Sequence, residues 1–240
     1  MQIKTSAIIL NSHKHNDKST IVNAYSRHFG KISFAVYGTH GKKAVVRAAH
    51  LQPLSIVEID IVHLPGQDIQ KIKDLRMEYV FRSIPFDPVK NSIALFIAEM
   101  LSKTLRQPEE DEPLFEFLID SIRLLDEEPG NNPDFHLIFL LKLTNFLGFY
   151  PNSESNEIHY FDLMNGLFER NKPQHTHYLA DEYANMFYQL LNAEFQNVGD
   201  LHISRTKKKV ILNAILDYYK LHVPEFHGLH SLGVFQSLFD

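Results

Sequence analysis

The spacing of the apolar residues changes once along the chain, and this change limits the possible folds more than any other feature. Before Pro85 and Pro88, short runs rich in β-branched and aromatic residues alternate apolar with polar positions, which is typical of β-strands. After these prolines, apolar residues recur every three to four positions, which is typical of amphipathic helices. The sequence therefore predicts a β-rich segment followed by a helical segment.

Five strand-like runs fill the first segment, and short turns separate them. Gly30 is suited to the turn at 28–31, because glycine adopts positive φ without strain. Closing five short strands into a barrel removes the exposed hydrophobic edges of a flat sheet, so we expect a small barrel of the OB type. The predicted strands are residues 6–10, 20–25, 31–37, 54–62 and 69–75.

The second segment predicts helices with one interruption. Asp134 is expected to cap the third helix and Gly148 to end it. After that helix, Asn165-Gly166 separates two apolar runs, which predicts a β-hairpin. The predicted helices are one opening at residue 93 and those at 114–125, 134–146, 179–191, 207–221 and 234–239. The expected fold is α+β, with a five-stranded OB-fold barrel at 1–80 and an all-helical domain at 81–240 that carries a hairpin insertion at 149–178.

Charge divides the chain at the same place. Residues 1–80 hold eleven Lys and Arg against six Asp and Glu, whereas residues 81–240 hold thirteen against 23. The net charge of −5 hides this asymmetry. A basic β-rich domain joined to an acidic helical body indicates a polyanion-binding domain on a protein-interaction scaffold.

The loop at 38–47 carries three cations beside two glycines. Its Gly41-Lys42 pair does not belong to a nucleotide-binding P-loop, because Val36 and Lys43 stand where that motif needs Gly and Ser or Thr. Two interpretations stay open: a solvated loop, or contact of Lys42, Lys43 and Arg47 with phosphates.

A second basic cluster, Arg205 with Lys207–Lys209, lies at the head of the fifth predicted helix. Cations at a helix N-terminus are unfavourable, which suggests a further use such as phosphate contact, although solubility explains the cluster more simply.

Catalytic and metal motifs are weak. The chain has no cysteine, which excludes disulfides and thiolate metal sites. His159, Asp162, His175 and His177 are conceivable metal ligands, but surface or hairpin histidines are the simpler interpretation. No nucleophile, zinc-hydrolase or other catalytic motif occurs, so we predict a protein that is not an enzyme, with no cofactor and no metal. No apolar run approaches the roughly 20 residues of a membrane span, and a signal peptide is not expected.

Four short motifs, in this order, resemble the RecO recombination mediators of bacteria. The resemblance covers most of the chain, and the order and spacing of the motifs over 150 residues make the match more specific than any one motif. The motifs are the opening strands 7–10 and 18–22, the turn Arg27-His28-Phe29-Gly30-Lys31, the basic loop with Leu51-Gln52-Pro53 after it, and Leu147-Gly148-Phe149-Tyr150-Pro151.

The resemblance implies an N-terminal OB-fold, binding of single- and double-stranded DNA, annealing of complementary strands, and help in loading RecA onto DNA coated by single-strand-binding protein. It also implies RecR and the C-terminal tail of the single-strand-binding protein as partners. Many members carry a four-cysteine zinc site after the Gly-Phe-Tyr-Pro stretch. This chain has none of those cysteines, so 149–178 is expected to keep the hairpin without the metal.

The sequence thus predicts a cytoplasmic, nucleoid-associated DNA-repair protein of bacteria with two sites. The alternatives are a helical adaptor whose basic barrel binds an acidic protein and, less well supported, a metal-dependent enzyme built on the histidines. For the tail, the side of the second helix around Arg123 is the competing location. The predicted DNA-binding residues are Lys14, Arg27, Lys31, Lys42, Lys43 and Arg47, and the predicted tail-binding residues are Arg205, Lys207, Lys208 and Lys209.

Overall fold

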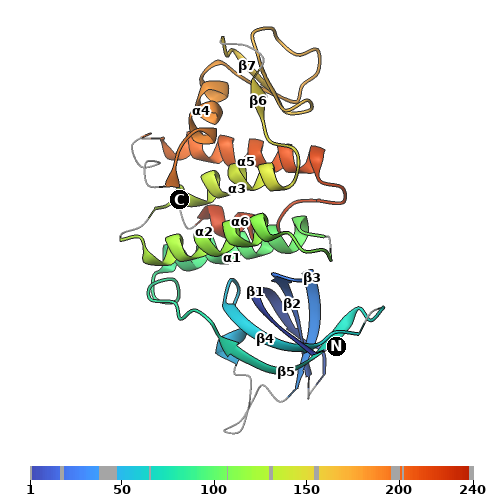
Figure 1. Cartoon of the computed structure of the whole chain (residues 1–240). Coiled ribbons are helices and arrows are strands. Elements are labelled where there is room, and N and C mark those ends of the chain that lie inside the picture. The colour runs from blue at the N-terminus through green and yellow to red at the C-terminus, as the bar shows by residue number, and fades with distance from the viewer. Residues whose placement is uncertain are drawn as a thin grey trace. The chain divides into compact units, whose positions relative to one another are not determined.

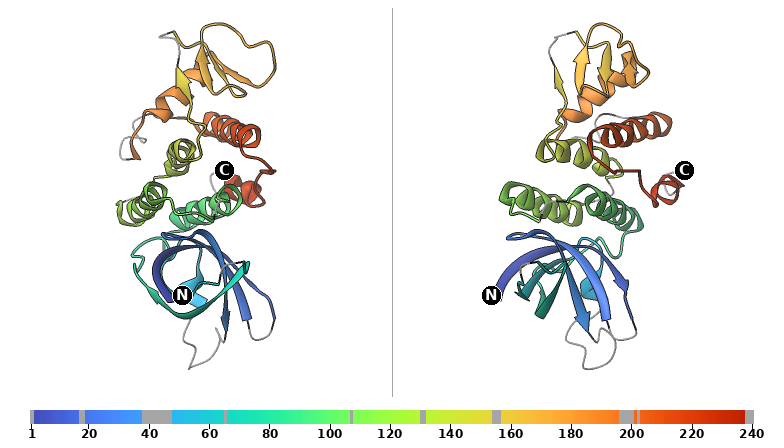
Figure 2. Two further views of the ribbon diagram at one scale, coloured as in Figure 1. Left: turned by 45° about the vertical axis from the view of Figure 1, so that its right-hand side comes forward. Right: turned by 90° about the vertical axis from the view of Figure 1, so that its right-hand side faces the viewer.

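Five strands close into a barrel at the N-terminal end of the chain in its computed structural model (Figures 1 and 2). Their order around the barrel is β1-β2-β3-β5-β4, and only the β3–β5 pair is parallel. The predicted five-stranded barrel is confirmed. Its strands are β1 (Gln2–Lys14), β2 (Ser19–Ser26), β3 (Gly30–Tyr37), β4 (Ile56–Val62) and β5 (Ile69–Met77), and a 3-10 turn, η1 (Ala48–Leu51), precedes β4.

The chain divides into two compact units, Met1–Pro129 and Gly130–Asp240. The first two helices therefore belong to the same unit as the barrel. The domain boundary expected after residue 80 stays a prediction. The structure describes residues 2–16, 19–37, 48–64, 66–106, 108–129, 132–153, 157–195, 201 and 203–237.

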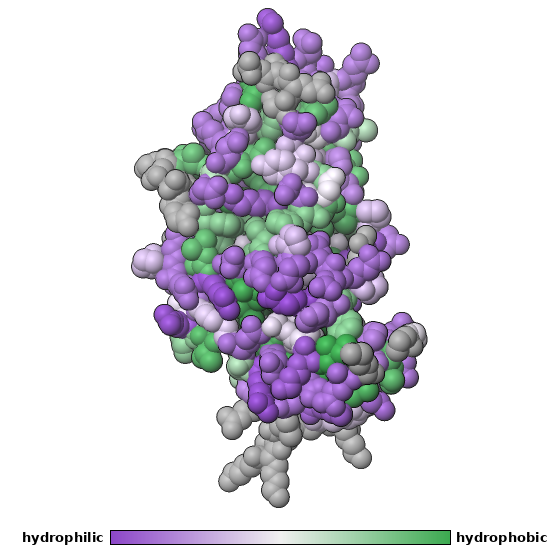
Figure 3. Space-filling model, in the orientation of Figure 1, coloured by the Kyte–Doolittle hydropathy of each residue, from purple (hydrophilic) through white to green (hydrophobic). Residues whose placement is uncertain are grey.

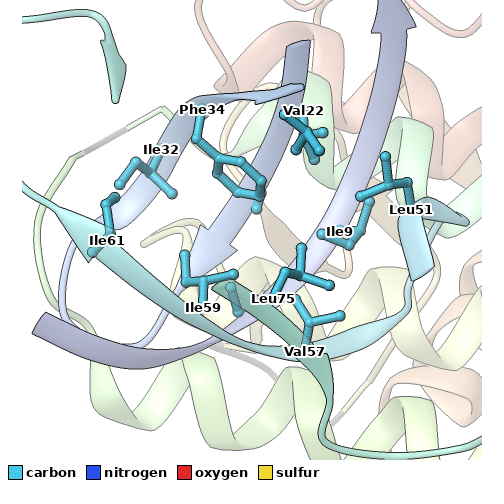
Figure 4. Packing of buried hydrophobic residues seen from close by; sticks show 12 residues of the cluster. Ile9, Val22, Ile32, Phe34, Leu51, Val57, Ile59, Ile61 and Leu75 are labelled. Atoms are coloured by element: carbon cyan, nitrogen blue, oxygen red, sulfur yellow. The ribbon is translucent and has the colours of Figure 1, made fainter. Parts of the chain in front are cut away.

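The barrel interior is filled by the apolar positions of the alternating strands. In β3, Ile32, Phe34 and Val36 point inward, and the turn before them uses Gly30 at a φ of 55°. Leu51 of η1 joins the same cluster (Figure 4). The outward positions of β3 are only partly buried, which leaves one side of this strand available for other contacts.

Two helices complete the first unit, α1 (Pro88–Thr104) and α2 (Glu112–Glu127). Helix α1 begins before the predicted residue 93, because the Asp87 side chain accepts hydrogen bonds from the N–H groups of Val89 and Lys90 and Pro88 suits the first helical position. Helix α2 buries the predicted apolar face, and α1 contacts β1.

A buried carboxylate fixes the connection between the barrel and α1. Asp126 accepts hydrogen bonds of 2.8–2.9 Å from the backbone N–H groups of residues 82–84 and one of 3.0 Å from the Tyr79 hydroxyl. Burial raises the pKa of Asp126, but these hydrogen bonds outweigh burial and lower the pKa below its usual value. Lys90 donates to the carbonyl oxygens of Asp126 and Glu128. The end of α2 and the segment before α1 are thus held together.

The second unit contains four helices among its described residues, and α3 contacts both α4 and α5. The expectation that the Asp134 side chain caps α3 is wrong: Asp134 stands at the N-cap position, but its side chain makes no capping hydrogen bond and pairs instead with Lys208. The Tyr219 hydroxyl of α5 donates to the Leu140 carbonyl of α3 at 2.7 Å. The helices are α3 (Phe135–Phe146), α4 (Asp181–Leu191), α5 (Arg205–His222) and α6 (Leu232–Ser237).

The predicted hairpin around Asn165-Gly166 is confirmed and belongs to a four-stranded sheet of order β6-β8-β7-β9. Phe161 of this sheet stacks on Phe187 of α4, with ring centroids 4.4 Å apart. Gly166 has a φ of 67°, and a Cβ there would lie 2.5 Å from the hydroxyl oxygen of Tyr218 in α5. Only glycine fits this approach. The strands are β6 (Asn152–Ser153), β7 (Tyr160–Asp162), β8 (Leu167–Glu169) and β9 (Tyr178–Ala180).

Candidate nucleic-acid interface

A row of polar side chains crosses the outer face of the barrel. Asn11, Asn23 and Ser33 are aligned on β1, β2 and β3. Ser33 Oγ donates to Asn23 Oδ1 at 2.6 Å, and Asn23 Nδ2 donates to Asn11 Oδ1 at 2.7 Å. Asn11 Nδ2 continues the row to Ser102 Oγ of α1, at 2.7 Å. On β1–β3, this row separates the part of the outer face where Arg27 and Lys31 contact α2 and α1 from the part that holds exposed Tyr37. We call these parts the covered half and the open half.

Arg27 lies in the covered half, where α2 engages it. Its guanidinium pairs with the carboxylates of Glu112 and Glu116, the latter at 2.6 Å, and lies 4.6 Å from the centroid of the Phe115 ring. Burial lowers the pKa of Arg27, but the hydrogen bonds and charges of Glu116 and Glu112 outweigh burial and raise it. The contact with DNA predicted for Arg27 would have to compete with two carboxylates.

Lys31 lies in the covered half as well. Its Nζ donates to the Ser102 carbonyl oxygen at 2.6 Å. Burial, and to a smaller extent the charge of Arg106, lowers the pKa of Lys31. Lys31 and Arg27 therefore both hold the helices against the barrel, and their predicted DNA contacts stay predictions.

The open half combines a cation with exposed apolar side chains. Register pairing places Lys71 of β5 beside Ala35 of β3, and Tyr37 follows on the same face two residues later. Tyr37 is 65% exposed and Ile69 is 41% exposed. Lys71 is exposed too. Lys14 is also exposed, but register pairing through Thr20 puts it on the face of Val36 and not on that of Tyr37. In the view of Figure 3, hydrophobic residues lie among the hydrophilic ones on the barrel surface.

Lys42, Lys43 and Arg47 fall outside the described residues. They belong to the segment that directly follows Tyr37 in the chain. The open half therefore offers an exposed cation and an exposed aromatic ring, and the basic loop comes next in the chain.

Sequence reasoning missed Tyr37 and Lys71 as candidate site residues. Alternation along β3 gives Tyr37 the same outward orientation as Lys31, so this signal was present. The position of Lys71 depends on the parallel pairing of β3 with β5, which no local pattern reveals.

The four cations at the head of α5 differ in whether they have a carboxylate partner. Lys207 forms an ion pair with Glu182, and Lys208 Nζ lies 2.7 Å from Asp134 Oδ2. Asp134 is 5% exposed, and its Oδ1 has no hydrogen-bond partner among the described residues. Burial raises the pKa of Asp134, although Lys208 opposes this shift. Lys207 and Lys208 thus have structural partners.

Arg205 and Lys209 are exposed, and neither forms an ion pair within the described part of the chain. They are four residues apart, so they lie on one stripe of α5 together with Asn213. At the competing location, the Arg123 guanidinium lies 5.6 Å from the Tyr79 ring centroid. Within the cluster at the head of α5, Arg205 and Lys209 are therefore the cations without a carboxylate partner among the described residues.

One of the candidate metal ligands, Asp162, is engaged in hydrogen bonds of the small sheet. The Asp162 carboxylate accepts hydrogen bonds from the N–H groups of Met164 and Asn165 and from the Asn165 side-chain amide, and His175 Nε2 lies 3.1 Å from it. Burial raises the pKa of Asp162, but these hydrogen bonds lower it overall. Among the described residues, no three His, Cys, Asp or Glu side chains gather closely enough to hold a metal ion. Without cysteine and with Asp162 already engaged, the residues do not fit the four-cysteine zinc site that Sequence analysis describes for many family members.

Two family models together cover nearly the whole chain. One, described as Recombination protein O N terminal, matches residues 1–81, and the other, Recombination protein O C terminal, matches residues 85–232. The chain belongs to the recombination protein O family.

Relatives of this family match over their full length. The DNA repair protein RecO of Phocaeicola vulgatus is 38% identical over 238 residues, which is 99% of each chain. The proteins of the same name from Bacteroides fragilis and Flavobacterium psychrophilum are 38% and 33% identical, over at least 99% of each chain. The predicted family is confirmed, and membership of this DNA-repair family supports a non-catalytic role. Within the described residues, no helix has both the length and the apolar character needed to cross a bilayer.

Proposed function

We propose that this recombination protein O member binds single- and double-stranded DNA through the open half of its barrel, and anneals complementary strands there. The open half carries the proposal because exposed Lys71 pairs with Ala35, and exposed Tyr37 follows Ala35 on the same face, directly before the basic loop in the chain. Cations contact phosphates whatever the sequence, and an aromatic ring stacks on any base. Such a surface binds DNA without sequence preference, as annealing requires.

We further propose the finer mediator role: help in loading RecA onto DNA coated by single-strand-binding protein, with RecR as a partner, in the cytoplasm at the nucleoid. The tail of the single-strand-binding protein would bind beside α5, steered by the cluster Arg205 and Lys207–Lys209. Within that cluster, Arg205 and Lys209 support the proposal best, because Lys207 and Lys208 already have carboxylate partners.

The test of the DNA site is the triple variant Lys42→Ala, Lys43→Ala, Arg47→Ala. Each lost phosphate contact should reduce the slope of log affinity against log salt by about 0.7 on single strands. A labelled oligonucleotide titrated at several salt concentrations measures both affinity and slope. The matched control is Lys4→Ala with Arg76→Ala, because both cations pair with carboxylates of the barrel unit.

An unchanged affinity and slope in a folded triple variant would contradict the assignment of the loop. If the unaltered chain does not bind DNA at all, the adaptor with an acidic protein partner becomes the better proposal.

For the tail site, reversing Arg205 and Lys209 to Glu should slow association of an acidic tail peptide and make it less sensitive to salt, because charges at the rim of a site act mainly on the association rate. Equal association rates for both proteins at low salt would exclude this location.

A further inference from the structure

Helix α6 is the last described element of the chain, and the side chains of Phe235 and Gln236 hold it against the rest of the second unit. Phe235 is 3% exposed, whereas its neighbour Val234 is 68% exposed. The Phe235 ring meets the His136 ring of α3 edge to face, with centroids 4.8 Å apart. Gln236 Nε2 donates to Asn213 Oδ1 of α5 at 3.2 Å. A short segment of the chain therefore lies against α3 and α5 much as a bound peptide would.

The segment depends on these contacts for its structure. Six residues are too few for a helix that is stable alone in water. Residues 223–231, which connect α6 to α5, form no helix or strand. Helix α6 therefore owes its structure to its contacts with α3 and α5.

Helix α6 has no acidic residue that could pair with the exposed cations of α5. Arg205, Lys209 and Asn213 form one stripe of α5, and α6 contacts this stripe at Asn213. Residues 232–237 include no acidic side chain. An acidic peptide with an aromatic side chain would keep the aromatic anchor and add charge-assisted bonds to the two exposed cations.

We propose that α6 is an exchangeable internal ligand, which occupies the site beside α5 until an acidic peptide with a terminal aromatic residue displaces it. This inference rests on the proposed function of the α5 cations. Because the ligand can bind only while α6 is released, its apparent affinity falls in proportion to the released fraction. A released fraction between 0.1 and 10% is usual for a minor state, so freeing the site should raise affinity about tenfold or more.

The first test uses the full chain with Phe235→Ala and, as matched control, Val234→Ala. The probe is the fluorescein-labelled peptide Ser-Asp-Asp-Asp-Leu-Phe with a free carboxylate, followed by anisotropy. We expect Phe235→Ala to bind the probe about tenfold more tightly and Val234→Ala to bind it as the unaltered chain does. Circular dichroism checks that the helices remain.

The second test closes the site instead of opening it, which keeps the inference testable if Phe235→Ala fails to fold. The chain has no cysteine, so Asn213→Cys with Gln236→Cys supplies the only two thiols. A short bis-maleimide should join them across the contact between α5 and α6. The joined protein should lose probe binding, whereas the same variant before joining should retain it.

The outcomes separate the inference from the function on which it rests. Tighter binding by Phe235→Ala, or loss of binding in the joined protein, supports exchange. Equal probe affinity in all forms overturns the exchange and leaves the tail site standing elsewhere on the chain. No probe binding in any form, including Phe235→Ala, overturns the tail site beside α5 and the exchange with it.

Discussion

The barrel's outer face and the head of α5 are both basic, but the fold uses their cations differently. On the barrel, Arg27 and Lys31 are held by side chains and a carbonyl of α1 and α2 near the surface. At α5, Lys208 is held by Asp134, a buried carboxylate that has lost most of its contact with water. Removing the cation should therefore lower the free energy of unfolding more at α5 than on the barrel, because a buried charge without a partner is costly.

Each region also keeps exposed cations. Lys71 is exposed on the barrel, and Arg205 and Lys209 are exposed on α5. The comparison shows that the cations of one basic cluster can have two roles. Some stabilise the fold, and others remain for a ligand. Substitutions of the first kind should change stability, and substitutions of the second kind should change binding.

The largest effect is expected at α5. Lys208→Met leaves the Asp134 carboxylate buried without its partner, so the free energy of unfolding should fall by about 3 kcal/mol. The matched control is Lys209→Met, an exposed site where the change should stay within about 0.5 kcal/mol. Urea denaturation measures both. Equal stability of the two variants would show that the two lysines do not differ in the way the structure indicates.

A smaller loss is expected on the barrel. Arg27→Ala removes two carboxylate pairs and the contact with Phe115, but the partners are partly exposed, so about 1–2 kcal/mol should be lost. DNA affinity of the folded variant should stay close to that of the unaltered chain. If Arg27→Ala instead weakens DNA binding without a loss of stability, Arg27 is a DNA contact and the division between covered and open halves is wrong.

The open half should respond in the opposite way. Tyr37→Ala removes the exposed ring and should reduce single-strand affinity by about 1 kcal/mol, because stacking on one base is lost. Stability should hardly change. Tyr37→Phe keeps the ring and serves as the control. A titration in which Tyr37→Ala binds single strands as tightly as Tyr37→Phe would remove Tyr37 from the site.

The smallest effect concerns pH, where Asp126 and Asp134 should act with opposite signs. The pKa of Asp126 is lowered in the folded chain, so its stabilisation is present above the unfolded value near 4 and is lost as the pH falls through the folded value. The pKa of Asp134 is raised, so its contribution is present below the unfolded value and is lost as the pH rises through the folded value.

Comparison with Asn variants isolates each carboxyl. On acidification from pH 6, the stability advantage of the unaltered chain over Asp126→Asn should shrink. Relative to Asp134→Asn, the stability of the unaltered chain should increase. Neither change can exceed about 1.4 kcal/mol per pH unit for one group. Urea denaturation at several pH values measures the differences, and slopes of the same sign would contradict the two environments described for these carboxylates.

The sequence alone determined the order and type of the main elements. The alternation of apolar and polar residues predicted the five strands, and the three-to-four-residue spacing of apolar residues after Pro85 predicted the helices. Asn165-Gly166 predicted the hairpin between β7 and β8. These features depend on contacts between near neighbours in the chain and on backbone preferences, so a local pattern records them.

Tertiary structure decided which charged residues have partners. Arg27 meets Glu112 and Glu116, more than 80 residues further on, and Lys208 draws the Asp134 side chain away from the capping role that its position predicts. The parallel pairing of β3 with β5 decided that Lys71 lies beside Ala35, close to Tyr37. A pattern of charges along the chain gives no distances between residues far apart in sequence, and the partner of a cation depends on those distances and on burial.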